Sequence, residues 1–146
     1  MKGYIFVNRY CKGIQAGIQG AHAILRLARK NGEEFQKWLD SHETIVILSA
    51  ASHDHLEAIK ARLEEIGGIE DIQTFTEEGL RDSLTALSFI GDEQLISVQT
   101  EMYEWRQLRK VGEGLKRREF DSDMYFKYGQ TYELALYLQG FSKHDG

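Results

Sequence analysis

The distribution of apolar and polar positions predicts a chain in which strands and helices alternate. Segments rich in β-branched and aromatic residues are predicted to be strands. They are Lys2–Tyr10, Thr44–Ala50, Asp71–Thr76 and Leu84–Ile90. The second of these, TIVILSA, is almost continuously apolar, so we expect it to be covered on both faces of a sheet.

Helices are predicted where apolar residues recur every three or four positions. The predicted helices are Gly13–Asn31, Glu33–Asp40, Ser52–Ile66 and one that begins near Asp92. Ser52 is a suitable N-cap for the third helix. The side chains expected to face inward from the second and third helices are Phe35, Trp38 and Leu39, and Leu56, Ile59, Leu63 and Ile66.

The helix predicted over Gly13–Asn31 has three faces, because residues three and four apart are neighbours on a helix. We expect an apolar face and a face that begins with small residues to be buried, and the third face to be polar. The apolar face consists of Ile14, Ile18, Ala21, Leu25 and Ala28. The second consists of Gly17, Gly20, Ile24 and Leu27, and the polar face of Gln15, Gln19, His22, Arg26 and Arg29.

Gly17 and Gly20 are unfavourable within that helix. Each costs roughly 1 kcal/mol relative to alanine. We therefore expect them to allow close approach of the backbone to a strand or a ligand.

The elements follow the order β-α-β-α-β-β-α, which predicts an α/β fold. We expect a four-stranded mixed sheet with helices on its faces and at least one parallel crossover. Residues 1–103 are predicted to form this domain, and residues 104–146 a basic and aromatic C-terminal extension.

Two interpretations of the extension stay open. Its segment Trp105–Arg118 carries six bases and one acid, and a short helix is predicted over Thr131–Gln139. Basic residues interleaved with aromatic ones suit contact with single-stranded nucleic acid. Alternatively, the aromatic side chains pack the extension onto the sheet or onto a second subunit, which would form a homodimer.

The composition indicates where in the cell the protein is expected to act. The chain of 146 residues contains no apolar run of the ~18 residues that a membrane span needs, so we expect no membrane partner. Its N-terminus is too short and polar for a secretory signal. Cys11 is the only cysteine, which excludes an internal disulfide and favours a cytoplasmic location.

The net charge of −5 is distributed unevenly. Residues 1–30 carry six bases and no acid, whereas residues 31–103 carry 16 acids and four bases. A basic first third can steer tRNA or another polyanion toward the helix that begins at Gly13. The candidate contacts are Lys12, Arg26, Arg29 and Lys30. The alternative is that these charges only solvate a surface.

Several segments together resemble one known family. Residues 19–23 read Gln-Gly-Ala-His-Ala, and Trp38-Leu39 precede the strand TIVILSA. The helix HLEAIKARLEEIGG is followed by IQTFTEEGL and then by LTALSFIGDEQLI. In this order they resemble the Q-C-S/A-H-A helix start, the tryptophan followed by the K-V-V-L-K strand, the second helix, the D-A-G loop, and the last strand and helix of the archaeal and eukaryotic (class II) peptidyl-tRNA hydrolases. The resemblance covers about residues 1–103, and the shared order carries it rather than any single motif.

The resemblance implies a peptidyl-tRNA hydrolase II-like fold and cleavage of the ester between a peptide and the 3′ end of tRNA. Gln19 and His22 match their family counterparts directly. Gln15 occupies the place of the family's catalytic lysine, and Lys12 is the nearest lysine.

The loop after the third predicted strand also differs from the family pattern. Glu77 or Glu78 replaces the aspartate of the D-A-G motif, and we take Glu77 as the catalytic candidate. The loop is about four residues shorter than in the family, and Arg81-Asp82-Ser83 stands where the family has a threonine.

The chemistry of ester hydrolysis assigns roles to these residues. A water must be activated and an oxyanion stabilised. Glu77 can orient the water, and His22 can act as a base near neutral pH or serve only as a structural hydrogen-bonding residue. Gln15 offers only a neutral donor. The alternative to an enzyme is a family member that has lost the reaction and binds RNA, a nucleotide or a protein.

Other candidate chemistry is weaker. His53 and His55 could touch a metal, but no third ligand is evident, so we expect no metal site. Cys11 lacks a Cys-His-Asn pattern, which argues against a nucleophile. No phosphate-binding glycine loop of standard spacing occurs, and we expect no cofactor.

Overall fold

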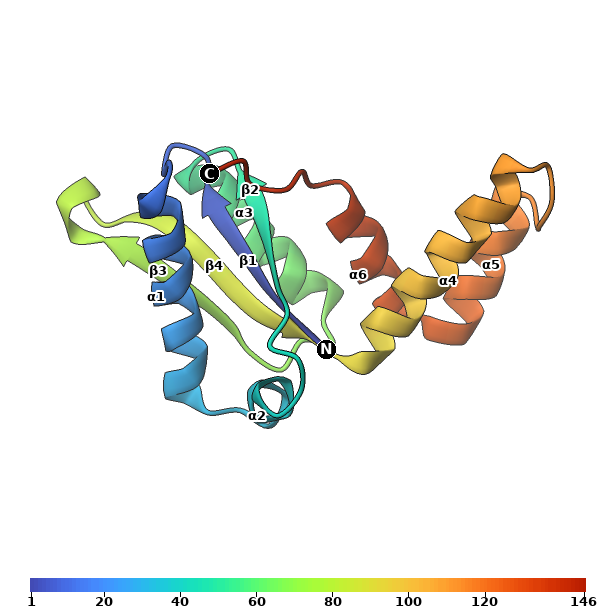
Figure 1. Ribbon diagram of the computed structural model, residues 1–146, viewed down its shortest axis with the longest axis horizontal. Coiled ribbons are helices and arrows are strands. Elements are labelled where there is room, and N and C mark those ends of the chain that lie inside the picture. Colours follow the sequence, from blue (N-terminus) through green and yellow to red (C-terminus); the bar gives the residue numbers. More distant parts are fainter.

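The computed structural model describes all 146 residues, and its regular elements are four strands and six α-helices (Figure 1). The elements of the first half are β1 (Lys2–Asn8), α1 (Ile14–Lys30), α2 (Glu33–Leu39), β2 (Ile45–Ala50) and α3 (His53–Ile66). Those of the second half are β3 (Ile72–Glu77), a short 3₁₀ turn (Glu78–Leu80), β4 (Ser83–Gly91), α4 (Glu93–Lys110), α5 (Arg117–Tyr128) and α6 (Gln130–Gln139).

The strands form one mixed sheet in the order β2-β1-β4-β3. β1 and β2 are parallel, and β4 is antiparallel to both β1 and β3. The connection from β1 to β2 runs through α1 and α2, so it is the parallel crossover that the sequence predicts. The predicted α/β class and four-stranded mixed sheet are therefore confirmed.

The two faces of the sheet are covered unequally. α1 and α2 lie on one face, where alternate residues of β1, Ile5 and Val7, contact the helix at Gly20. The intervening residues Tyr4 and Phe6 belong to the main core on the other face, together with residues of α3 and of the last three helices. The larger core therefore lies on the face away from α1.

The last three helices extend to one side of the sheet (Figure 1). α4 runs without a break across the predicted boundary between residues 103 and 104. α5 was not predicted. Trp105 of α4 stacks on Phe120 of α5 with ring centroids 4.4 Å apart. Tyr132 of α6 is fully buried. Trp105, Phe120 and Tyr132 thus pack the extension within this chain, whereas Phe126 is 92% exposed, and a homodimer stays a prediction.

The chain returns to the sheet after α6. The residues Ser142–His144 run antiparallel to the outer edge of β2, where the N–H of Ser49 donates to the carbonyl of Ser142 over 2.9 Å. The N–H of His144 donates to the carbonyl of Ile47 over 3.0 Å. These bonds occupy part of an edge that the four strands leave open.

Three burial predictions are wrong. The apolar face of α1 lies outward, with Ile14 79% and Leu25 61% exposed, whereas Gly20 and Leu27 of the second predicted face are buried. The buried residues of α1 are Ala16, Gln19, Gly20, Ala23 and Leu27.

β2 is covered on one face only, because α1 lies over β4, β3 and β1 and leaves β2 at the edge. Ile45 and Ile47 are exposed there. Leu39 is also largely exposed, whereas Phe35 and Trp38 are buried as predicted.

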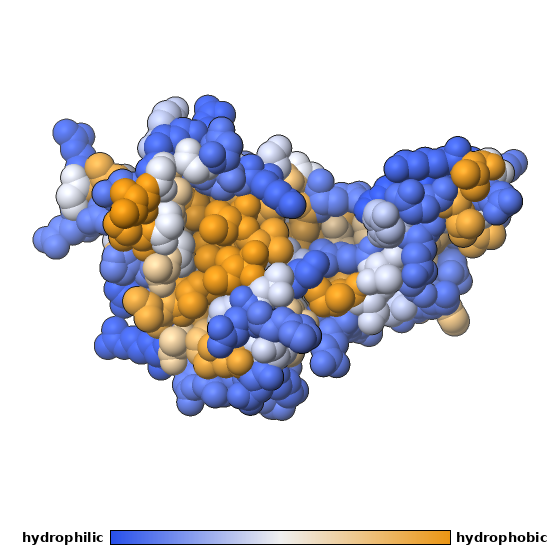
Figure 2. Space-filling view, viewed as in Figure 1, coloured by the Kyte–Doolittle hydropathy of each residue, from blue (hydrophilic) through white to orange (hydrophobic).

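Apolar residues therefore cover part of the outer surface on the α1 side. Figure 2 shows this apolar area over the region where β1 and β2 run beside α1. None of the six helices combines the length and the apolar character needed to cross a bilayer.

Neither Gly17 nor Gly20 of α1 is required for a close approach of the backbone, contrary to the prediction. A Cβ atom added at Gly17 would meet nothing within 4 Å, so no close approach requires this glycine. At Gly20 the nearest atom would be a methyl group of Ile5 at 3.5 Å, which is an ordinary contact.

Candidate functional site

A cavity of about 550 Å³ opens beyond the carboxyl ends of β1 and β2. Three connections surround it: the segment between β1 and α1, the start of α3, and the turn between β3 and β4. Its lining consists of Asn8, Tyr10, Cys11, Ser52, His53, Gly79, Leu80, Arg81, Ser83 and Thr85. Ligands of α/β sheets commonly bind at such strand ends.

A chain of hydrogen bonds runs from Thr85, which lines this cavity, to Gln19 and Glu77, which do not line it. The hydroxyl of Thr85 on β4 donates to Oε1 of Gln19 on α1. The Nε2 of Gln19 in turn donates to Oε2 of Glu77 over 3.0 Å. Gln19 is 3% exposed, and both ends of its amide are satisfied, so the amide is held in one orientation. The other oxygen of Glu77, Oε1, has no protein partner.

Cys11 lies on the wall of the cavity near Glu77. Burial raises the pKa of the Cys11 thiol, and the negative charge of Glu77 raises it further. A raised pKa keeps the group as a thiol at neutral pH, and thiols are poor nucleophiles. Cys11 therefore lines the cavity but is not suited to act as a nucleophile.

His22 and Arg26 both contact Phe75, a half-buried residue of β3. The rings of His22 and Phe75 stack with centroids 4.2 Å apart, and the Arg26 guanidinium lies 5.6 Å from the Phe75 centroid. His22 makes no hydrogen bond within the chain. It belongs to an aromatic and cationic surface next to the Gln19–Glu77 pair and is not bonded to that pair.

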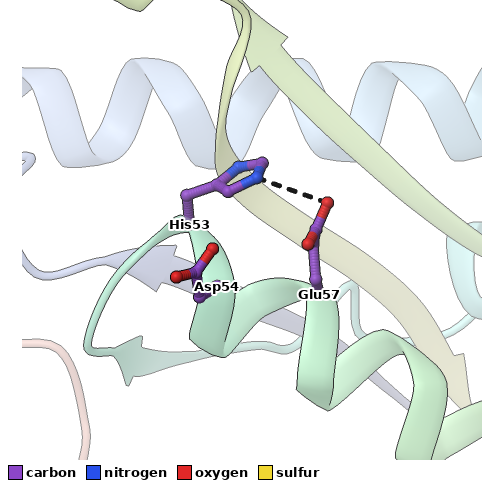
Figure 3. A group of neighbouring side chains, drawn as sticks. All are labelled: His53, Asp54 and Glu57. Carbon is purple, nitrogen blue, oxygen red and sulfur yellow. Dashed lines mark ion pairs between the residues drawn. The ribbon is translucent and has the colours of Figure 1, made fainter.

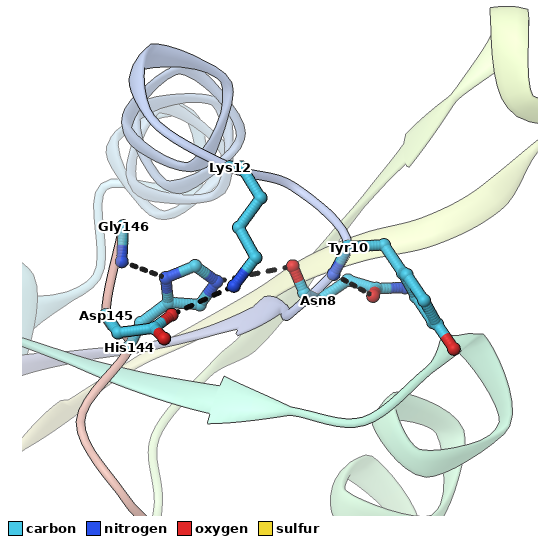
Figure 4. Close-up of polar contacts among 6 residues, drawn as sticks. All are labelled: Asn8, Tyr10, Lys12, His144, Asp145 and Gly146. Carbon is cyan, nitrogen blue, oxygen red and sulfur yellow. Dashed lines mark hydrogen bonds and ion pairs between the residues drawn. The ribbon is translucent and has the colours of Figure 1, made fainter.

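Gln15 is exposed, and its side chain makes no hydrogen bond within the chain. Lys12, which is nearest to it among the lysines, is directed toward the C-terminal segment (Figure 4). Its Nζ forms an ion pair with Asp145 at 3.0 Å. The structure thus brings Gln19 and Glu77 together, and leaves Gln15 and Lys12 outside this contact.

The remaining candidate RNA contacts lie far from the cavity. Arg29 and Lys30 occupy the last turn of α1, and about 21 Å of helix separates them from Gln15 at 1.5 Å per residue. A polyanion that touched both regions would have to follow α1 along its length.

The two histidines near the start of α3 bond to the backbone. Nδ1 of His53 accepts from the N–H of Leu84, and Nδ1 of His55 accepts from the N–H of Ala51, both over 2.8 Å. His53, Asp54 and Glu57 lie close enough to share an ion, as Figure 3 shows. Both carboxylates are exposed, and Nε2 of His53 is paired with Glu57 at 3.3 Å.

Sequence reasoning missed the role of two residues at the site. Thr85 is buried inside β4 and fixes Gln19, but nothing in an apolar strand singles out one threonine in advance. Arg81 lines the cavity and has no ion pair within the chain, although its position in the loop had been noted. It lies in the left-handed region with a φ of 57°, which helps the chain reverse between β3 and β4.

Comparison with models of known protein families and with curated protein sequences finds no match to this chain.

Proposed function

We propose that the chain hydrolyses the ester that joins a peptide to the 3′ end of tRNA, and that Glu77 activates the attacking water. The observation that carries this proposal is the hydrogen-bonded series Thr85–Gln19–Glu77, which begins at Thr85 in the cavity wall and ends at a carboxylate whose charge acts on Cys11 in the same wall. It fixes one carboxylate oxygen and leaves the other without a partner, which suits a general base. The resemblance of residues 1–103 to class II peptidyl-tRNA hydrolases names the substrate.

The proposed reaction needs no group beyond this chain, the ester and water. Glu77 accepts a proton from water while the water oxygen bonds to the ester carbonyl carbon. The resulting tetrahedral intermediate collapses as the bond to the ribose oxygen breaks. Protonated Glu77 returns its proton to that oxygen, and the peptide leaves with a free carboxyl group. The raised pKa of Cys11 favours water over the thiol as nucleophile.

Arg81 is the best candidate for the missing cation. Gln15 cannot supply a positive charge, whereas Arg81 lines the cavity and is not paired with an acid. Its guanidinium can hold a phosphate or stabilise the oxyanion. The nearby start of α1 has no acidic residue in its first turn, so its partial positive charge is not offset there.

The RNA would approach along the basic first third of the chain. Phe75, covered by His22 and Arg26, offers a surface of rings and a cation beside the cavity. Such a surface suits an unpaired base near the 3′ end.

The test is release of the peptide from a peptidyl-tRNA, measured by the appearance of free tRNA. We expect Glu77→Gln to lower the rate about 10²- to 10⁴-fold, as loss of a general base does. Glu78→Gln is the matched control, because Glu78 is exposed beside Glu77 and should leave the rate unchanged. Release by the native chain no faster than in buffer would rule out hydrolysis of this ester.

A second candidate function is binding without cleavage. The stacked surface around Phe75 favours it, because that surface needs no base or oxyanion donor. An inert chain that still binds tRNA, and whose affinity falls at least tenfold in the double variant Phe75→Ser with Arg26→Gln, would support binding alone.

A further inference from the structure

A second cavity, of about 340 Å³, lies between the sheet and helices α4 and α6. Its apolar wall is formed by Val46 and Leu48 of β2, Met102 of α4 and Leu138 of α6. All four contact or belong to the main core on the face away from α1. Lys2 lines this cavity and Asn8 lines the candidate functional site, and these two residues lie at opposite ends of β1, about 20 Å apart.

The charged residues around this cavity are all basic. Lys2, Arg106 and Lys143 line it, and no acidic residue does. None of the three forms an ion pair within the chain; Arg106 donates only to Oε1 of Gln139, over 3.1 Å. In a chain with a net charge of −5, three unpaired cations at one cavity create a local positive potential.

The neutral polar groups in the wall are satisfied by one another. Tyr4 is 3% exposed, and its hydroxyl donates to Oε1 of Gln99 over 3.1 Å. The Nε2 of Gln99 lies 2.9 Å from the same hydroxyl. This pair therefore needs no ligand. The groups of the cavity that still lack a partner are the three cations, which a negatively charged ligand would neutralise.

We propose that this cavity binds a small amphiphilic anion. The apolar body of the ligand lies against Val46, Leu48, Met102 and Leu138, and its carboxylate or phosphate head lies among Lys2, Arg106 and Lys143. A cavity of this size with an apolar wall and a few charged groups is typical of small-molecule sites. This site is separate from the ester chemistry proposed above, and neither depends on the other.

The experiment titrates the full chain with octanoate and with octyl phosphate, following heat and the methionine methyl signals by NMR. We expect both ligands to bind with the Met102 methyl signal shifting and the signal of Met124, which lies within the buried core, staying in place. Octanol and inorganic phosphate should bind at least tenfold more weakly, because each lacks one half of the ligand.

The variant that tests the head group is Lys2→Gln with Arg106→Gln and Lys143→Gln, which should weaken both ligands at least tenfold. Its matched control is Arg109→Gln with Lys110→Gln and Lys116→Gln, which removes the same charges from exposed positions outside the cavity and should leave the affinities unchanged. Tighter binding of one head group than of the other identifies the preferred anion. Absence of binding, equal binding of octanol, or equal loss in the two triple variants would overturn the proposal.

Discussion

Gln19 shows how one polar side chain can be buried without a penalty. Its amide accepts from Thr85 and donates to Glu77, so neither end is left unpaired inside the protein. Burying an amide without such partners costs about 1–3 kcal/mol. The same two bonds fix the position of the Glu77 carboxylate, so the residue contributes both to folding and to the proposed site.

We predict that Gln19→Leu destabilises the chain by about 1–3 kcal/mol, because it leaves the Thr85 hydroxyl buried without its acceptor. Urea unfolding of this variant measures the loss. The double variant Gln19→Leu with Thr85→Val should recover part of it. If the double variant is less stable than Gln19→Leu by the full cost of Thr85→Val alone, the two residues are not coupled.

The pKa of Cys11 provides a second test at the same position. Glu77→Gln removes a negative charge that raises the pKa of the thiol, so the thiolate fraction at pH 8 should increase. We expect alkylation of Cys11, the only cysteine, to become a few-fold faster in this variant. The thiol should remain slower than a free cysteine, since burial is the larger cause of the raised pKa. An unchanged rate would place Glu77 too far away to act on this cavity.

α1 shows at the level of an element what the sequence pattern can predict and what it cannot. Its bounds follow from the pattern and from Asn31, which ends it in the left-handed region with a φ of 54°. The buried face follows only in part: Gly20 and Leu27 are buried as predicted, but Ile14 and Leu25 lie outside. A periodicity analysis weights large apolar residues and therefore added an exposed face to the buried one.

The predictions for β2 and α5 were wrong for related reasons. The apolar run of β2 is typical of a central strand, but strand order is a property of the whole sheet, and β2 lies at its edge. α5 buries only Phe120 and Met124, so its periodicity is weak and it was missed. Within the candidate site, the family resemblance gave Gln19 and Glu77 as separate candidates, and the bond between them and the role of Thr85 required the structure.

We predict that Gly17→Ala stabilises the protein by about 0.5–1 kcal/mol, because alanine favours the helix and the site is open. Thermal unfolding of the variant should show the rise. Gly13→Ala is the contrasting variant: Gly13 also has open space but a φ of 55°, so alanine there should destabilise. A loss of stability in Gly17→Ala would indicate a contact at Gly17 that the structure lacks.

At the scale of the molecule, the extension is part of the main core. Phe120 and Met124 of α5 and Tyr132 and Leu138 of α6 pack in one cluster with Phe6 of the sheet. Sheet and extension should therefore unfold together rather than as independent units. Tyr132 is the largest of the fully buried side chains, and its hydroxyl donates to Asp121.

This arrangement predicts a loss of stability at alkaline pH. Burial raises the pKa of Tyr132 above the ordinary value of about 10, and the hydrogen bond to Asp121 raises it further. The folded protein therefore holds this proton more tightly than the unfolded chain. The resulting stabilisation is complete below pH 10 and is lost as the pH rises above it.

Tyr132→Phe tests this prediction. The variant should be less stable than the native chain by about 1 kcal/mol at pH 7, because it lacks the hydrogen bond to Asp121. The difference should shrink or reverse at pH 11, where only the native chain must keep a phenol protonated. Urea midpoints at both pH values measure it, and a difference independent of pH would contradict the raised pKa.

The segment Ser142–His144, which runs along the outer edge of β2, also has a consequence for solubility. An uncovered edge strand presents free N–H and C=O groups to which a strand of another molecule can bond. Here that edge lies beside the exposed side chains of Ile45 and Ile47, which would strengthen such pairing. Shortening the chain after Phe141 should therefore produce growing light scattering at high concentration, while the intact chain stays clear. We therefore expect the pairing of Ser142–His144 with β2 to protect the protein from aggregation.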